Sequence, residues 1–189
     1  MSNAPPSPEP RRFRNAMGLF ATGVAVITAP AGEEVVAMTV NAVSSVSLDP
    51  MLVLFCPSQK SRFAEHIDRL CGFTINFLRD DQQALSTFFA GGWKEPLAPP
   101  FRFVPARCAP RLEGSLASLH CERERLVEAG DHWIVIGRVL DLQVGIAPHK
   151  PLLFFGGRYR NVDFSESSTP APDLADVHDE PAHIFYDHW

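Results

Sequence analysis

Short apolar runs separated by turn residues dominate the pattern of this chain. Such runs occupy residues 24–28, 35–38, 51–56, 72–78, 115–127, 133–144 and 152–155. Each run has the length and composition of a β-strand, and the turn chemistry of residues 30–33 predicts that the first two form a hairpin. Asp49-Pro50 predicts a further turn, immediately before the run at residues 51–56.

Helical periodicity is confined to three short segments. Helices are expected at residues 11–21, where Gly23 follows, at residues 61–67 with Ser61 as cap, and from Asp80 or Asp81 to residue 90. Residues 93–110 contain five prolines and predict a loop. Many strands with few short helices favour a mainly β fold, an antiparallel barrel rather than alternating βαβ units.

Composition indicates an ordinary globular protein. The chain has 189 residues, of which 46% are hydrophobic and 21% charged, which fits one domain with its own core. A net charge of −5 argues against nucleic-acid binding, for which a basic face is expected. No apolar run approaches the ~20 residues that span a bilayer, and residues 2–10 lack the apolar centre of a secretory signal. We therefore expect a cytoplasmic protein without a membrane partner.

The four cysteines, Cys56, Cys71, Cys108 and Cys121, are scattered along the chain without a C-x-x-C pair. Zinc sites and disulfide frameworks show tighter spacing. Isolated cysteines in apolar surroundings usually behave as small core residues. The sequence therefore predicts reduced, structural thiols.

Composition also divides the chain. We predict a flexible N-terminal segment at residues 1–10, one domain at residues 11–162 and a tail at residues 163–189. The tail is rich in Ser, Pro and Asp and ends in His-Ile-Phe-Tyr-Asp-His-Trp, so it is either flexible or docks on a partner subunit or the site. Three histidines recur there at every fifth residue without Cys or carboxylate support, so no metal site is expected.

The segment at residues 38–50 carries the most distinctive chemistry. It places Asn41, Ser44, Ser45 and Ser47 between two β-like stretches. Hydroxyls, an amide and exposed backbone N–H groups can hydrogen-bond the polar edge of a flat heterocycle. The alternative is a polar turn whose side chains bond their own backbone. Strand alternation would place Ser45 and Ser47 on one face and Ser44 with Val46 on the other.

A small cationic cluster follows the next strand. Lys60 and Arg62 can neutralise a phosphate, the first as a point charge and the second as a planar fork. Ser61 at a helix start adds free N–H groups and a favourable dipole. The alternative is a solvated loop with two ordinary surface charges. Together with residues 38–50, this cluster predicts a nucleotide-like cofactor held outside a Rossmann motif.

Several ordered motifs resemble those of one family. They are Ala-Thr-Gly-Val-Ala-Val-Ile-Thr at residues 21–28, Met-Thr-Val-Asn at 38–41, Ser-Val-Ser-Leu-Asp-Pro at 45–50, Gly-Asp-His at 130–132 and Gly-Arg-Tyr-Arg at 157–160. This set is similar to the short-chain flavin reductases with an FMN-binding split barrel, the reductase components of two-component monooxygenases. Met51 stands where that family often has a second proline. The resemblance covers residues 12–162.

The resemblance implies a set of cofactor-binding residues. These are Met38, Thr39, Val40, Asn41, Ser44, Ser45, Val46, Ser47, Ser58, Lys60, Ser61, Arg62, Arg158 and Tyr159. The last two match the closing motif and would line the nicotinamide side or pack at an interface. Phe88, Phe89 and Trp93 are instead expected in core or dimer packing rather than in cofactor stacking.

His132 is the residue that the resemblance places near the flavin and the nicotinamide. Asp131 precedes it and could fix the ring tautomer. We expect an orienting or proton-sharing role, against the alternative of a structural histidine at a strand edge. Because the cofactors carry the organic chemistry, the protein needs no activated nucleophile.

The resemblance implies a homodimeric NAD(P)H:flavin oxidoreductase of the FMN-binding split β-barrel fold. It would reduce FMN or FAD with NADH or NADPH and supply reduced flavin to a separate monooxygenase. The absence of a G-x-G-x-x-G motif fits NAD(P)H binding in an open groove. The alternatives are a flavin-binding electron carrier or flavin chaperone without turnover, and a related barrel that binds haem or a pyridoxal-type cofactor.

Overall fold

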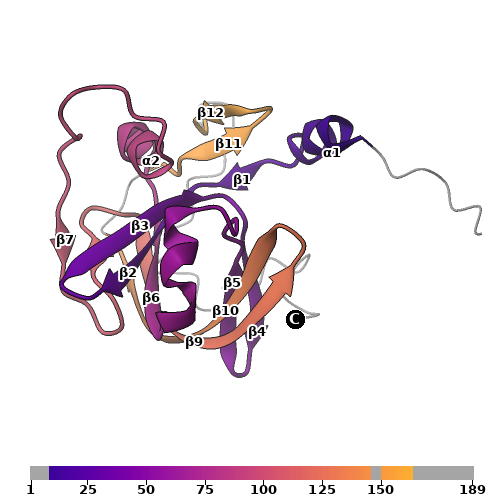
Figure 1. Cartoon of the computed structure of the whole chain (residues 1–189). Helices are drawn as coiled ribbons and strands as arrows, with labels where there is room; N and C mark the ends of the chain where they lie inside the picture. Colours follow the sequence, from indigo (N-terminus) through magenta and orange to yellow (C-terminus); the bar gives the residue numbers. More distant parts are fainter. Residues whose placement is uncertain (1–8, 146–149, 164–189) are drawn as a thin grey trace, which may run out of the picture.

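A curled, seven-stranded antiparallel sheet forms the centre of the molecule (Figure 1), and its strand order is β3-β2-β6-β9-β10-β5-β4. The computed structural model describes residues 9–145 and 150–163. The strands of this sheet are β2 (Ala25–Ala31), β3 (Glu34–Val40), β4 (Val43–Leu48), β5 (Met51–Phe55), β6 (Gly72–Phe77), β9 (Ala117–Ala129) and β10 (His132–Val144). The predicted mainly β architecture is confirmed.

Smaller elements surround this sheet. They are the sheet β1-β11-β12 (Thr22–Gly23, Leu153–Phe155, Arg158–Arg160), the ribbon β7-β8 (Phe103–Val104, Arg111–Leu112), the helices α1 (Pro10–Met17) and α2 (Gln83–Phe89), and the 3-10 helices η1 (Arg62–Arg69) and η2 (Asp80–Gln82). None of the helices within the described ranges is long and apolar enough to cross a membrane.

The two edge strands of the main sheet, β3 and β4, are consecutive in the chain. Only Asn41 and Ala42 separate them. In a flat sheet, strands six positions apart would lie about 29 Å from one another, whereas three Cα–Cα steps reach about 11 Å at most. The sheet must therefore curl until its edges approach, and because β3 and β4 do not pair with each other, the barrel stays split.

The interior of this split barrel is packed with aromatic and branched side chains. The Phe55 ring contacts those of Phe63 and Phe73 edge-on, with centroid distances of 5.8 and 5.0 Å. Phe63 and Ile67 come from η1, which lies across the gap between β3 and β5 in Figure 1. This helix fills the split with apolar side chains instead of a further strand.

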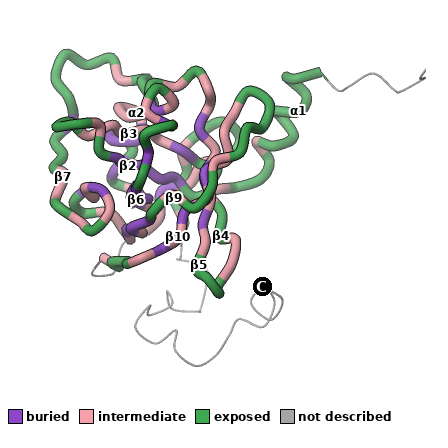
Figure 2. The backbone as a smooth tube through the Cα atoms, turned by 60° about the horizontal axis from the view of Figure 1, so that its bottom comes forward, coloured by how far each residue is buried: buried purple, intermediate pink, exposed green. Residues whose placement is uncertain are grey.

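Strand β2 is buried on both faces. Ala25 and Ile27 face the barrel interior, whereas Val24 and Val26 belong to a second apolar cluster beneath α2 and β11. Figure 2 shows the buried central strands between exposed α1 and the exposed long loop that follows α2. The continuous apolar run at residues 24–28 therefore reflects a two-sided strand.

A buried polar network lies on the outer face of β2, β6 and β9. The Asn76 Nδ2 group donates to Val26 O at 2.9 Å, and its Oδ1 atom accepts from Leu112 N at 2.8 Å and from Ser118 Oγ at 3.0 Å. Thr74 Oγ1 donates to Ala109 O at 2.7 Å. No buried side-chain polar atom of the described residues lacks a partner, so the network fixes the loop before β8 to the sheet.

Several predicted boundaries were wrong. The first helix ends at Met17 rather than at residue 21, because the N–H groups of Gly18 and Leu19 close its last turn and Gly23 belongs to β1. Pro30 continues β2 instead of opening a turn, which is possible because β6 pairs only with residues 25–28 of β2. Neither Asp80 nor Asp81 caps the helical segment, which begins as η2 with Arg79 at its N-cap.

The predicted burial of the cysteines is confirmed for only one of them. Cys121 is fully buried, and desolvation raises its pKa to about 12. Cys56 and Cys108 are half-buried, and Cys71 is exposed, so these three are not core residues. All four are free thiols.

A close approach at Gly137 limits what this position can hold. A Cβ atom there would lie 2.9 Å from Phe73 Cε1 and 3.1 Å from Cys121 Cβ, and nearer still to Phe73 Cζ. Gly137 also stands at an irregularity in the β9–β10 register. The glycine therefore makes room for the central Phe73 ring, as glycines in strand interiors often do.

We predict that Gly137→Ala lowers the free energy of unfolding by about 1–3 kcal/mol, because the added methyl overpacks the core. Chemical denaturation with fluorescence detection measures the change. Gly23→Ala is the matched control, since a Cβ atom at position 23 meets nothing within 4 Å. Equal stabilities of the two variants would contradict the packing argument.

Candidate functional site

A groove of about 950 Å³ lies between the edge strand β3, the start of η1 and the segment from α2 to β7. It brings together Met38, Thr39, Ser61 and Arg62 from two distant predicted motifs. Its other walls carry aromatic side chains from the segment between α2 and β7. The remaining lining residues that matter below are Phe88, Phe89, Trp93, Glu95, Phe101 and Phe103.

The start of η1 supplies the cationic end of the groove. The Ser61 side chain caps the helix as predicted, accepting from Ala64 N at 3.2 Å and donating to Ser58 O at 2.7 Å. The side chains of Phe63 and Ile67 anchor the helix in the barrel, so its exposed N-terminal Arg62 is held at the groove. Arg62 forms no ion pair within the described ranges. This end of the groove therefore combines a helix N-terminus with an unneutralised guanidinium, a favourable setting for an anion.

Thr39 forms the polar part of the β3 wall. Its Oγ1 group donates to Ser86 O on α2 at 2.7 Å, and the Ser86 hydroxyl contacts the Tyr159 hydroxyl at 2.9 Å. Because the Thr39 hydrogen is committed to Ser86, its oxygen can only accept toward the groove. Tyr159 and Arg158, predicted at the nicotinamide side, do not line the groove: Tyr159 contacts α2 through Ser86, and Arg158 is exposed.

The aromatic wall was missed from the sequence. The rings of Phe88, Phe89, Phe101 and Phe103 contact one another with centroid distances of 5.1–6.0 Å. Phe89 packs against the second apolar cluster, as expected of a core residue, and Phe88, Phe89 and Trp93 all line the groove as well. Helical spacing on α2 indicates an apolar face but does not show that a following proline-rich loop returns to extend it.

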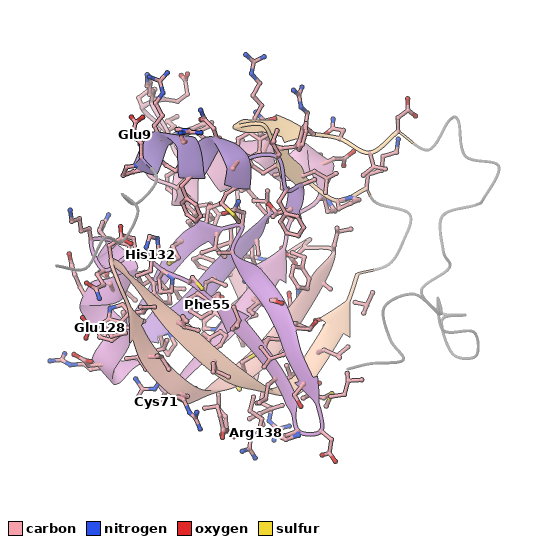
Figure 3. The ribbon with its side chains drawn as sticks, turned by 90° about the vertical axis from the view of Figure 1, so that its right-hand side faces the viewer. Glu9, Phe55, Cys71, Glu128, His132 and Arg138 are labelled. Carbon is pink, nitrogen blue, oxygen red and sulfur yellow. The ribbon has the colours of Figure 1, made fainter. Side chains whose placement is uncertain are left out.

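His132 stands at the tip of the β9–β10 hairpin, beside the loop that precedes η1. Figure 3 shows it near Glu128 at the edge of the molecule. His132 pairs with Ser58 as an isolated bridge, and Trp133 N donates to Pro57 O at 2.9 Å. Ser58 and His132, 74 residues apart in the sequence numbering, are thus brought together, although neither lines the groove.

Asp131 orients this histidine. Its Oδ1 atom lies 2.8 Å from His132 Nδ1, and this hydrogen bond, with the nearby charges of His132 and Lys60, lowers the pKa of Asp131. The carboxylate therefore stays ionised and favours the tautomer that carries its proton on Nδ1. Nε2 of the half-exposed imidazole then carries no hydrogen and can accept a hydrogen bond.

The serines of residues 44–47 lie apart from the groove. They belong to β4, a strand where a polar turn had been predicted as the alternative. A register shift between Ser45 and Ser47 interrupts the alternation, so Ser44 and Ser47 lie opposite Leu54 and Leu52, two residues on the same face of β5. The predicted sharing of a face by Ser45 and Ser47 is therefore wrong.

The residues that join β3 to β4 connect these serines to the groove. Val40 is buried in the barrel and Asn41 Nδ2 donates to Thr22 Oγ1 at 3.3 Å. Val46 is half-buried on β4.

The predicted docking tail at residues 163–189 lies outside the described residues apart from Asp163.

The groove has the features that a phosphorylated, flat heterocycle requires. It offers an anion position at Arg62 and the start of η1, a hydrogen-bond acceptor at Thr39 and a wall of aromatic rings within one cavity. Ligand sites of this kind are mostly apolar with a few placed polar groups. The residues present thus fit an FMN-like molecule.

Comparisons with known proteins show the family of this chain. The family described as flavin reductase like domain matches residues 17–163. The chain is 36% identical over 164 residues to the reductase subunit HsaB of a flavin-dependent monooxygenase from Rhodococcus jostii, covering 87% of this chain and 83% of that protein. It is 40% identical over 160 residues to the NADH-dependent FMN reductase AsuE2 from Streptomyces nodosus subsp. asukaensis, covering 80% and 85%.

A solved structure is similar over nearly its whole length. The flavin reductase PheA2 in its native state superposes with a TM-score of 0.77 at 40% sequence identity, covering 82% of this chain and 99% of that one. The split-barrel fold expected from the sequence is therefore confirmed. The chain belongs to the flavin reductase-like family.

Proposed function

We propose that this protein is an NADH-dependent flavin reductase that transfers hydride from NADH to FMN and supplies the reduced flavin to a separate monooxygenase. The observation that carries the proposal is the single groove in which the η1 N-terminus, Arg62, Thr39 and an aromatic wall meet. The similarity to an NADH-dependent FMN reductase and to a monooxygenase reductase subunit supports the choice of donor, acceptor and partner.

The phosphate of FMN would bind at the start of η1. Ser61 holds the helix end in place, Arg62 provides a forked donor, and Lys60 adds a positive charge in the same loop. The backbone N–H group of Lys60 donates to Ser58 Oγ at 3.3 Å, and this hydrogen bond holds the loop between β5 and η1. FAD could use the same position, because its first phosphate has the same chemistry.

The isoalloxazine ring would lie between β3 and the aromatic wall. Thr39 Oγ1 can accept from a ring N–H, and Met38 offers a polarizable apolar contact. When bound, the flavin supplies the hydride-accepting centre of the reaction. The chain's own part is to orient the two flat ring systems and exclude water between them.

The residues outside the groove have separate proposed roles. His132, oriented by Asp131, would orient the nicotinamide or share a proton at the flavin edge through Nε2. The proposed flavin contacts also include Asn41, Ser44, Ser45, Val46 and Ser47, which do not line the groove and would meet a part of the flavin that extends past the β3–β4 connection. Arg158 would line the nicotinamide side.

A homodimer is part of this proposal. Helix α1 buries none of its residues and projects from the barrel (Figure 1). Phe13, Met17, Leu19 and Phe20 are 53–71% exposed on this helix and the following turn. Contiguous exposed apolar side chains of this kind mark interfaces, so a second copy that covers them would complete the site from its own surface.

The function is tested by NADH oxidation with no flavin, FMN, FAD or riboflavin added in turn to the purified protein. We expect oxidation that depends on added flavin. Tight stoichiometric flavin with negligible oxidation under every condition would instead support an electron carrier or flavin chaperone.

For the phosphate position, we predict that Lys60→Ala with Arg62→Ala weakens FMN binding at least tenfold while riboflavin binding changes little. Charge-assisted contacts to a phosphate are each worth about 1.5–3 kcal/mol, and riboflavin has no phosphate to lose them. Titration calorimetry with both ligands measures the difference. Arg69→Ala, at the other end of η1, is the control, and an equal loss for both ligands would rule out the phosphate role.

For His132, we predict that His132→Ala lowers the rate of hydride transfer more than it weakens flavin binding. General acid–base and orienting contributions are of the order of 10²–10⁴-fold at most, and an orienting role lies at the low end. Stopped-flow reduction of bound FMN gives the rate, and calorimetry gives the affinity. Unchanged reduction by the variant would leave His132 a purely structural residue.

A further inference from the structure

The loop between Trp93 and Leu97 holds an acidic side chain at the groove. The Trp93 indole donates from Nε1 to Leu97 O at 2.9 Å, which closes the loop around Glu95. Pro96 follows Glu95 and restricts the backbone further. Both Trp93 and Glu95 line the groove that also contains Ser61 and Arg62. The loop backbone around Glu95 is therefore closed, and its exposed side chain stands at the groove.

Glu95 has no ion pair or hydrogen bond within residues 9–145 and 150–163, although arginines and lysines are common in this chain. Other carboxylates beside grooves here are paired: Glu113 with Arg102, and Asp81 with Arg79 at 2.7 Å. The Glu95 oxygens are thus free to accept hydrogen bonds from a ligand. Two walls of the groove carry opposite charges: the guanidinium of Arg62 and the unpaired carboxylate of Glu95.

An unpaired carboxylate can hydrogen-bond both hydroxyls of a vicinal diol, and it repels a phosphate ester. Its two oxygens can accept from both hydroxyls of a ribose, which is how acidic residues select NAD in other folds, whereas a 2′-phosphate places about two negative charges against it. We propose that Glu95 binds the adenosine ribose of the hydride donor and is the residue that selects NADH over NADPH.

The lining of the groove agrees with a second flat ring beside the flavin. Phe101, which is 38% exposed, presents an aromatic face on the same loop as Glu95, and adenine stacks well on such faces. The adenosine half of the dinucleotide would therefore extend along the loop while its nicotinamide meets the flavin.

This inference rests on the proposed reductase function, and one set of kinetics separates the two. The ratio of kcat/KM for NADH to that for NADPH is measured at saturating FMN for the parent, Glu95→Gln and Glu95→Arg. We expect the parent to favour NADH, Glu95→Gln to reduce the ratio about tenfold through a gain with NADPH, and Glu95→Arg to invert it. The parent ratio should also fall as salt screens the repulsion.

Two further variants control the experiment. Glu65→Gln removes an exposed carboxylate of η1 that does not line the groove, and the ratio should stay at the parent value. Trp93→Phe breaks the bond to Leu97 O while keeping the aromatic ring, so the ratio should move partway toward that of Glu95→Gln.

Three outcomes are decisive. An unchanged ratio in Glu95→Gln, with normal NADH turnover, would overturn the role of Glu95 and leave the reductase function intact. A change in the KM for FMN instead of in the NADH to NADPH ratio would place the carboxylate at the flavin and also overturn the inference. No flavin-dependent oxidation by the parent would reject the proposed function itself.

Discussion

The two-residue connection between β3 and β4 is the constraint on which the rest of this structure depends. It joins the two opposite edges of a seven-stranded sheet and so forces the sheet to curl. Because those edges do not pair, a gap remains, and η1 fills it with Phe63 and Ile67. The N-terminus of the same helix is thereby placed at the outer side of β3, where Ser61 and Arg62 meet Met38 and Thr39. The elements that close the barrel therefore also form the walls of the groove.

The second requirement is that the groove walls stay in place without a ligand. Hydrogen bonds from Thr39 to Ser86, and between Ser86 and Tyr159, fix α2 to β3 and to the late β12 hairpin. On the far side, the Asn76 network ties the loop before β8 to the sheet, so the aromatic segment is held at both ends. Preformed walls reduce the ordering cost of binding. This arrangement suits a site that must bring two flat rings face to face.

The sequence predicted most strands of the main sheet, because their apolar runs are long and their turns have clear chemistry, but it did not predict β4 or the order of the strands in the sheet. It failed where tertiary contacts decide. Gly18 rather than Gly23 ends the first helix, and the β4 bulge changes the faces of Ser45 and Ser47. The pairing of Ser58 with His132 was not predicted, since nothing local in the sequence brings residues so far apart together. Phe88 and Trp93 were predicted to be packing residues. Their spacing in the sequence does not show that the loop after α2 returns to form a groove beside them.

The most direct test of this account is a crystal structure of the protein with FMN bound. We predict the FMN phosphate within hydrogen-bond distance of Arg62 at the start of η1, and the ring between Thr39 and the aromatic wall at Phe88. A phosphate bound away from the start of η1, or a ring outside this groove, would contradict the claim that curling of the sheet builds the flavin site.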